Sequence, residues 1–222
     1  AIQSYQTRAR EMIDAVAAIG RARGRRIMVR LVKGAYWDGE IKRAQEMGLS
    51  GYPVWTDKRH TDLSYLACAQ RLLAAAEIYP QFATHNAGTI AAILEMARAA
   101  GRIGADPGFE LQRLHGMGEG IHREVMKRAD APPLRIYAPV GEHRDLLAYL
   151  VRRLLENGAN SSFVHQLADE AVSIPALLAS PLRAAAPSTL PLPRRLYGES
   201  RVNALGVDPV VERERLPLLA RL

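Results

Sequence analysis

The sequence contains one cysteine, Cys68, among its 222 residues. A single thiol excludes a disulfide scaffold and favours a reducing compartment. Because Cys68 lies in an alanine-rich stretch typical of a helix, we interpret it as a packed core thiol and not as a nucleophile. No apolar run approaches the roughly 20 residues that a membrane span requires, and no stretch has the pattern of a signal peptide.

Several short catalytic and binding motifs are also missing. The sequence has no P-loop, no Cys/His metal-binding pattern and no HExxH helix. The glycines at positions 116, 118 and 120 superficially resemble a nucleotide-binding loop. They lack the GxGxxG spacing and the acidic residue about 20 positions further on, so we interpret them as a strand-to-helix turn.

Acidic residues are fewer than basic ones, 23 against 30, which gives a net charge of +7. Such an excess is compatible with a nucleic-acid-binding module, but that function needs a clustered basic face. Here the basic residues are scattered among acidic ones. An anionic cofactor, or membership of a larger protein, accounts for the excess equally well.

Apolar periodicity predicts a helix over 4–20 followed by four strand–helix units. The expected strands are 27–33, 80–84, 109–115 and 134–140, and the expected helices are 39–47, 62–77, 89–100, 120–129 and 142–157. Asp38 is the expected N-cap of the second helix, and 51–61 is an expected loop. This alternation, without an interior hairpin signal, indicates an α/β fold with parallel strands.

Polar residues gather where the expected strands end: Arg30, Lys33, Thr84, His85, Asn86, Gln112, Arg113, His115 and Tyr137. In a β/α barrel this end is the active face, and in a doubly wound sheet it is the ligand crevice. Lys33 has two interpretations, a Schiff-base lysine of a lyase or a lysine paired with an acid or an anion. His85 and His115 are either acid–base groups or hydrogen-bond donors to a ligand.

The last expected helix of the series carries adjacent arginines, Arg152 and Arg153, with Tyr149 before them and Glu156 after them. Guanidinium groups are long enough to converge on one carboxylate or phosphate through paired N–H bonds. Taken alone, the pair fits a solvated helix face with an Arg–Glu ion pair better than it fits an anion site.

Five segments in this order carry a resemblance to a known family: VRLVKGAYW (29–37), QFATHN (81–86), LHGMG (114–118), RIYAPV (135–140) and YLVRRLLENG (149–158). They closely resemble the flavin-dependent proline dehydrogenase domain of the bifunctional proline utilization A family. The resemblance covers about residues 1–170. Residues 171–195 resemble that family's linker, and 196–222 resemble the truncated start of its aldehyde dehydrogenase domain.

The resemblance implies a (β/α)₈ barrel, of which this chain supplies the end of strand four and strands five to eight, the second half. It implies that Arg152 and Arg153 hold the substrate carboxylate and that Glu156 supports their helix. Leu114 and Tyr137 are then expected to pack on the proline ring, with Tyr36 near the same pocket.

The resemblance also implies FAD at the carboxyl ends of the strands. Arg30 is expected beside the flavin N5 region and Gln3 at the isoalloxazine edge. The remaining residues in cofactor-binding segments are Val32, Gly34, Trp37, Lys58, Thr84, His85 and Asn86.

The implied reaction is oxidation of L-proline to Δ1-pyrroline-5-carboxylate, with electrons passed to a membrane quinone. The implied protein is cytoplasmic, peripherally associated with the membrane, and a homo-oligomer at full length. The family's remaining pocket residues, a lysine and an aspartate, precede the position of Ala1. We therefore expect the chain alone to bind FAD poorly and to show little or no activity.

Overall fold

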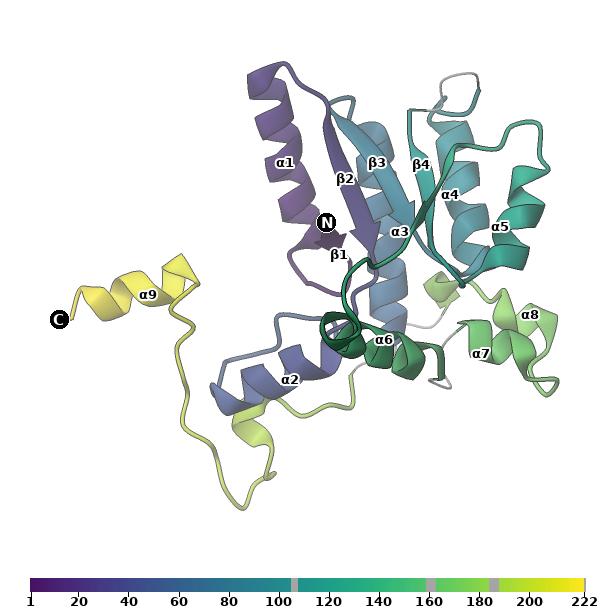
Figure 1. Ribbon diagram of the computed structural model, residues 1–222. Coiled ribbons are helices and arrows are strands. Elements are labelled where there is room, and N and C mark those ends of the chain that lie inside the picture. Colours follow the sequence, from purple (N-terminus) through teal and green to yellow (C-terminus); the bar gives the residue numbers. More distant parts are fainter. Residues whose placement is uncertain (105–107, 159–162, 184–187, 222) are drawn as a thin grey trace.

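Five parallel strands form one sheet whose spatial order follows the chain (Figure 1). The strands are β1 (Ile2–Gln3), β2 (Ile27–Val32), β3 (Ile78–Ala83), β4 (Glu110–Leu114) and β5 (Leu134–Tyr137). The computed structural model describes residues 1–104, 108–158, 163–183 and 188–221. Consecutive neighbouring strands with helical crossovers are the topology of a β/α barrel.

One face of the sheet is apolar and is covered by helices. Leu31, Phe82 and Leu111 lie side by side in the register of β2, β3 and β4, and all three are fully buried. The helices that pack on this face include α1 (Ala9–Arg23), α3 (Lys58–Ala74) and α4 (Ala87–Ala99), and α5 (Glu119–Met126) lies beside them. Burying each of these large side chains contributes about 2 kcal/mol to stability, so this layer is the core.

The opposite face of the sheet is polar. Glu110 is buried on it and accepts hydrogen bonds from Arg135 at 2.7 and 2.8 Å, from Gln112 at 2.7 Å and from Gln81 at 2.9 Å. In a closed barrel this face points to the interior. Within the described residues, β1 and β5 each pair with one neighbour, so the sheet is half of a barrel with two open edges.

Two helices lie at the end of the sheet to which the strand arrows point: α2 (Trp37–Glu46) and α6 (His143–Gly158) (Figure 1). α6 follows β5 but does not cover its outward face, where Ile136 is 51% exposed. The helix with the paired arginines therefore lies at the carboxyl ends of the strands.

The rest of the chain forms short elements: α7 (Phe163–Ala168), α8 (Ile174–Leu177), the 3₁₀ turns η1 (Pro181–Arg183) and η2 (Pro193–Arg195), and α9 (Glu212–Leu219). α9 extends away from the sheet (Figure 1). Among the described residues, no helix is both long enough and apolar enough to cross a bilayer.

The predicted order of strands and helices is confirmed, and the errors lie at element boundaries. The first helix was expected from residue 4 but begins at Ala9, because residues 4–8 form turns after β1. Asp38 is not an N-cap, since α2 starts at Trp37, two residues before the expected start at position 39. The helix expected from 62 begins at Lys58, because the Asp57 carboxylate caps it by accepting from the Arg59 N–H at 2.8 Å.

Candidate functional site

Arg30 and Tyr137 meet across the polar face of the sheet. The Arg30 guanidinium lies 4.3 Å from the centre of the Tyr137 ring, although β3 and β4 separate their strands. Three strand spacings in a flat sheet amount to about 14 Å, so the sheet curls toward closure here. The Arg30 Nε is buried and has no hydrogen-bond partner among the described residues, which makes it a donor available to a ligand.

Leu114 lies beside Tyr137 in the register of β4 and β5. Its backbone N–H donates to His85 Nε2 at 3.1 Å, which fixes the proton of a neutral ring on Nδ1. Burial, then the charges of His122, Arg113, Arg153 and Arg30, lower the pKa of His85 to about 4. His85 is therefore neutral near pH 7, and its Nδ1–H is a donor.

The paired arginines of α6 each lie over an aromatic ring. The Arg152 guanidinium is 4.1 Å from the centre of the Tyr36 ring, and Arg153 is 5.2 Å from the Tyr149 ring. The first contact joins α6 to the residue that precedes α2. Glu156 lies in α6, but its side chain falls outside the described part of the structure.

Thr84 and Asn86 flank His85 and serve the fold through their own hydrogen bonds. The Thr84 carbonyl lies 3.1 Å from His122 Nε2. The side-chain oxygen of Asn86, Oδ1, accepts from the Thr89 N–H at 2.8 Å and caps α4. These two residues thus hold the turn from which His85 projects.

Lys33 pairs with Asp62 on α3, and Lys58 Nζ contacts the second oxygen of the same carboxylate at 2.9 Å. Burial lowers the pKa of Lys33, and the attraction of Asp62 opposes that shift. Burial alone would raise the pKa of Asp62, but the two lysines outweigh it and lower it. The interpretation of Lys33 as a lysine paired with an acid is confirmed.

The cofactor-segment residues of β1 and β2 lie together at one end of the sheet. Gln3 and Val32 are register partners and are both half-buried. Gly34 has φ of 122°, and a Cβ there would come within 2.8 Å of the Tyr5 ring. Trp37 donates from Nε1 to the Trp55 carbonyl at 2.7 Å.

Three residues of this region were not predicted from the sequence: Asp62, Tyr65 and His122. Tyr65 is fully buried, and its hydroxyl lies 3.5 Å from the carbonyl oxygens of Leu31 and Ala83. Asp62 carried a detectable signal, since it stands four residues after Lys58 on one helix face. His115, which the sequence offered as an acid–base group, is exposed at the end of β4.

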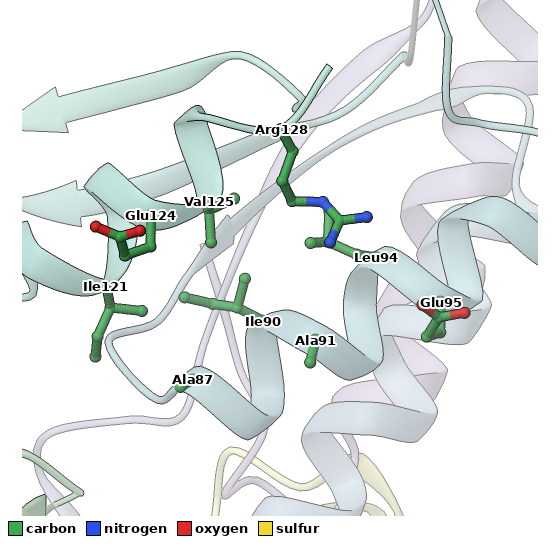
Figure 2. Close-up of a pocket in the computed structure, with 9 residues that line it drawn as sticks. All are labelled: Ala87, Ile90, Ala91, Leu94, Glu95, Ile121, Glu124, Val125 and Arg128. Carbon is green, nitrogen blue, oxygen red and sulfur yellow. The ribbon is translucent and has the colours of Figure 1, made fainter. Parts of the chain in front are cut away.

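An apolar groove of about 410 Å³ lies elsewhere, between α4 and α5. Figure 2 shows its lining, which includes Ile90 and Leu94 of α4 and Ile121 and Val125 of α5. The charged side chains at its rim pair within their own neighbourhoods, such as Glu124 with Lys127. This apolar groove lies among the covering helices and does not contain the polar residues at the strand ends.

Comparisons with known proteins identify the family of the chain. The sequence model of the family described as Proline dehydrogenase matches residues 1–166. The bifunctional protein PutA of Salmonella typhimurium is 52% identical over 93% of the chain, and proline dehydrogenase 1 of Bacillus subtilis is 32% identical over 73%. The chain spans 17% of the Salmonella protein and 46% of the Bacillus protein.

Solved structures give the same result. A mutant of proline utilization A from Bradyrhizobium japonicum is 56% identical and superposes with a TM-score of 0.91, over 99% of this chain and 23% of its own. Proline utilization A from Bdellovibrio bacteriovorus is 33% identical with a TM-score of 0.86, over 99% of this chain and 22% of its own. The chain belongs to the proline dehydrogenase family.

Proposed function

We propose that this chain supplies half of the barrel of an FAD-dependent proline dehydrogenase that oxidises L-proline to Δ1-pyrroline-5-carboxylate. The observation that carries the proposal is the arrangement of three arginines and three aromatic rings at the carboxyl ends of the strands. In a barrel of this kind, residues at that end of the strands perform the chemistry.

Arg152 and Arg153 bind the carboxylate of proline in this proposal. Two guanidinium groups on adjacent positions provide paired, charge-assisted N–H donors, which a planar carboxylate accepts. Leu114 and Tyr137, neighbours in the sheet register, offer an apolar surface to the pyrrolidine ring. Tyr36, under Arg152, keeps that guanidinium turned toward the strand ends.

The described residues fit FAD as the cofactor. Arg30 offers the buried, unpaired Nε–H described above, and His85 offers its Nδ1–H. Glycine is required at position 34 by the packing of the chain itself, because φ is +122° and a Cβ would clash with the Tyr5 ring. Its place in the cofactor site rests on the resemblance. The bound flavin would supply the acceptor for the hydride that leaves proline, which carries both of the electrons lost in the oxidation.

Of the other residues in the cofactor segments, Gln3, Val32 and Trp37 line the same end of β1 and β2, and Lys58 adds positive charge for a diphosphate. Thr84 and Asn86 contribute through the turn that carries His85. We assign the redox chemistry to the flavin.

The proposal extends to the whole protein of which this chain is a part. Its electron acceptor is a membrane quinone, so a cytoplasmic protein must associate peripherally with the membrane to pass electrons on. We assign 1–170 to the barrel half, 171–195 to a linker and 196–222 to the start of an aldehyde dehydrogenase domain. The missing barrel half and that domain are its partners, in a homo-oligomer.

The isolated chain is expected to bind FAD poorly and to have little or no activity. Its sheet has open edges at β1 and β5, and half of the barrel wall that would enclose a flavin is not in it. Flavin absorbance after purification, followed by a dye-reduction assay with proline, tests this. A yellow, active 222-residue protein would contradict it.

The activity itself is tested on the full-length protein with proline and with pyrrolidine, the same ring without a carboxylate. Arg153→Met should reduce turnover of proline at least 30-fold, since a charge-assisted pair contributes about 2 kcal/mol or more. The same variant should leave the much weaker oxidation of pyrrolidine within about twofold. An equal loss for both substrates would exclude the arginine as the carboxylate ligand.

A further inference from the structure

Residues 190–206 pack against α2, although they lie beyond the residues 1–166 that match the family. Figure 1 shows this part of the chain running beneath α2 before it leads away to α9. We call residues 190–206 the strap. Bifunctional relatives align with 93% of the chain, which is more than residues 1–166 contain, so their similarity continues beyond residue 166.

The first contact of the strap is apolar. Leu190 packs on a small cluster in which Tyr5, Ile41 and Val54 are buried and Trp37 and Tyr52 are partly buried. This cluster is separate from the main core and lies directly under α2. The strap thus completes the packing of the helix that begins at Trp37.

The second contact is a hydrogen-bond relay through Tyr52. Its hydroxyl donates to the Pro191 carbonyl at 2.7 Å and accepts from Gln45 Nε2 at 3.1 Å. Since Gln45 is in the last turn of α2, one hydroxyl joins the helix to the strap.

The third contact is between two glycines. The Gly206 N–H donates to the Gly48 carbonyl at 2.7 Å. A Cβ on Gly206 would lie 1.7 Å from the Met47 carbonyl oxygen, and one on Gly48, where φ is +61°, would lie 2.7 Å from the Ala204 carbonyl oxygen. The close approach of the two backbones therefore requires glycine at both position 48 and position 206.

The strap is also closed on itself. Asn203 donates from its backbone N–H to the Arg194 carbonyl at 3.0 Å and from its side-chain amide to the Pro193 carbonyl at 3.1 Å. Pro193 is buried. A loop held in this way presents a defined surface to α2.

We propose that the strap positions the aromatic side of the substrate site, with Tyr52 and Gly206 as positioning residues. The path is short. The strap holds α2, and Trp37, the first residue of α2, donates a hydrogen bond to the Trp55 carbonyl. Tyr36, directly before Trp37, lies against Arg152. The proposal rests on the proposed function, because it assigns the strap a role in binding the carboxylate of proline.

The test uses Tyr52→Phe and Gly206→Ala in the full-length protein. Tyr52→Phe removes the relay but keeps the ring, and Gly206→Ala forces the two backbones apart. Matched controls are Tyr197→Phe, an exposed tyrosine of the strap, and Gly39→Ala, a glycine of α2 with open space around its Cα. Steady-state kinetics, flavin content and hydrogen exchange of α2 and α3 are measured for each.

Both test variants should raise KM for proline about 3- to 10-fold, leave kcat and flavin content within about twofold, and speed hydrogen exchange in α2 but not in α3. The controls should match the parent protein in all three. If the parent protein oxidises proline but the two test variants leave KM unchanged, the strap proposal alone is overturned. Faster hydrogen exchange in both α2 and α3 also overturns it, because that result indicates general destabilisation. A parent protein that does not oxidise proline overturns the proposed function instead.

Discussion

The contact between Tyr36 and Arg152 is the most direct test of where α6 lies, because it joins two helices that are distant in sequence. The guanidinium lies 4.1 Å from the ring centre, and Tyr36 is 51% exposed. A cation–π contact at an exposed site contributes about 0.5–1 kcal/mol. That energy corresponds to a coupling of about 2- to 5-fold in kcat/KM, since 1.36 kcal/mol is tenfold.

The assay is a double-mutant cycle on proline oxidation by the full-length protein, with Tyr36→Leu, Arg152→Met and the two combined. Arg152→Met alone should lower kcat/KM about 30-fold or more, because it removes a charged partner of the carboxylate. Tyr36→Leu should cost 2- to 5-fold less in the Arg152→Met background than in the parent, because the stacking partner is already gone.

The matched control replaces Tyr36→Leu with Tyr149→Leu. Tyr149 lies on the same helix as Arg152, but its ring contacts Arg153. Tyr149→Leu should therefore lower kcat/KM by the same factor in the parent protein and in the Arg152→Met background. If the effects of Tyr36→Leu and Arg152→Met also multiply, α6 does not lie where the structure places it, and the reasoning is refuted.

Two further predictions concern stability. The pKa of His85 is lowered from 6.5 to about 4, so the unfolded chain binds more protons between those values. Stability must therefore fall as pH drops through that window, by at most about 3–4 kcal/mol. Thermal denaturation at pH 7.5 and pH 5 should show a smaller loss of stability for His85→Asn than for the parent protein, and equal losses would refute the assignment. Glu110→Ala should lower the unfolding free energy by about 3–5 kcal/mol, because it removes the acceptor of a buried hydrogen-bond network. Glu110→Gln should lower the unfolding free energy by less. Denaturant titration distinguishes the two variants, and equal losses of unfolding free energy would show that the charge of Glu110 does not matter.

The order of strands and helices was predictable because periodicity reports burial. In β4 the buried Leu111 stands between the polar residues Glu110 and Gln112, and this alternation is visible in the sequence. In β2 and β3 the buried Leu31 and Phe82 each follow a polar residue, Arg30 and Gln81. Boundaries were harder, since capping decides them locally. The Asp57 side chain accepts from a backbone N–H and caps the start of α3. Asp38 lies inside the first turn of α2 and does not cap it.

The candidate site was predictable only as separate pieces. A strand-end arginine and a distant tyrosine, such as Arg30 and Tyr137, give no local signal that they meet, because their contact depends on the curl of the sheet. His122 was missed for a related reason. Its role is to contact the Thr84 carbonyl of another element, and backbone acceptors leave no trace in a side-chain pattern.

The placement of α6 explains why aromatic rings recur beside the arginines. A helix packed on the outward face of β5 would gain its orientation from apolar burial, but Leu147, Leu150 and Val151 of α6 are 51%, 42% and 45% exposed in this chain. Burial of these side chains therefore contributes little to the direction of the arginines here. Arg152 is oriented instead by stacking on the ring of Tyr36, the residue that precedes α2. The geometry of the proposed carboxylate clamp, Arg152 and Arg153, consequently depends on α2 and on the residues that hold α2 in place.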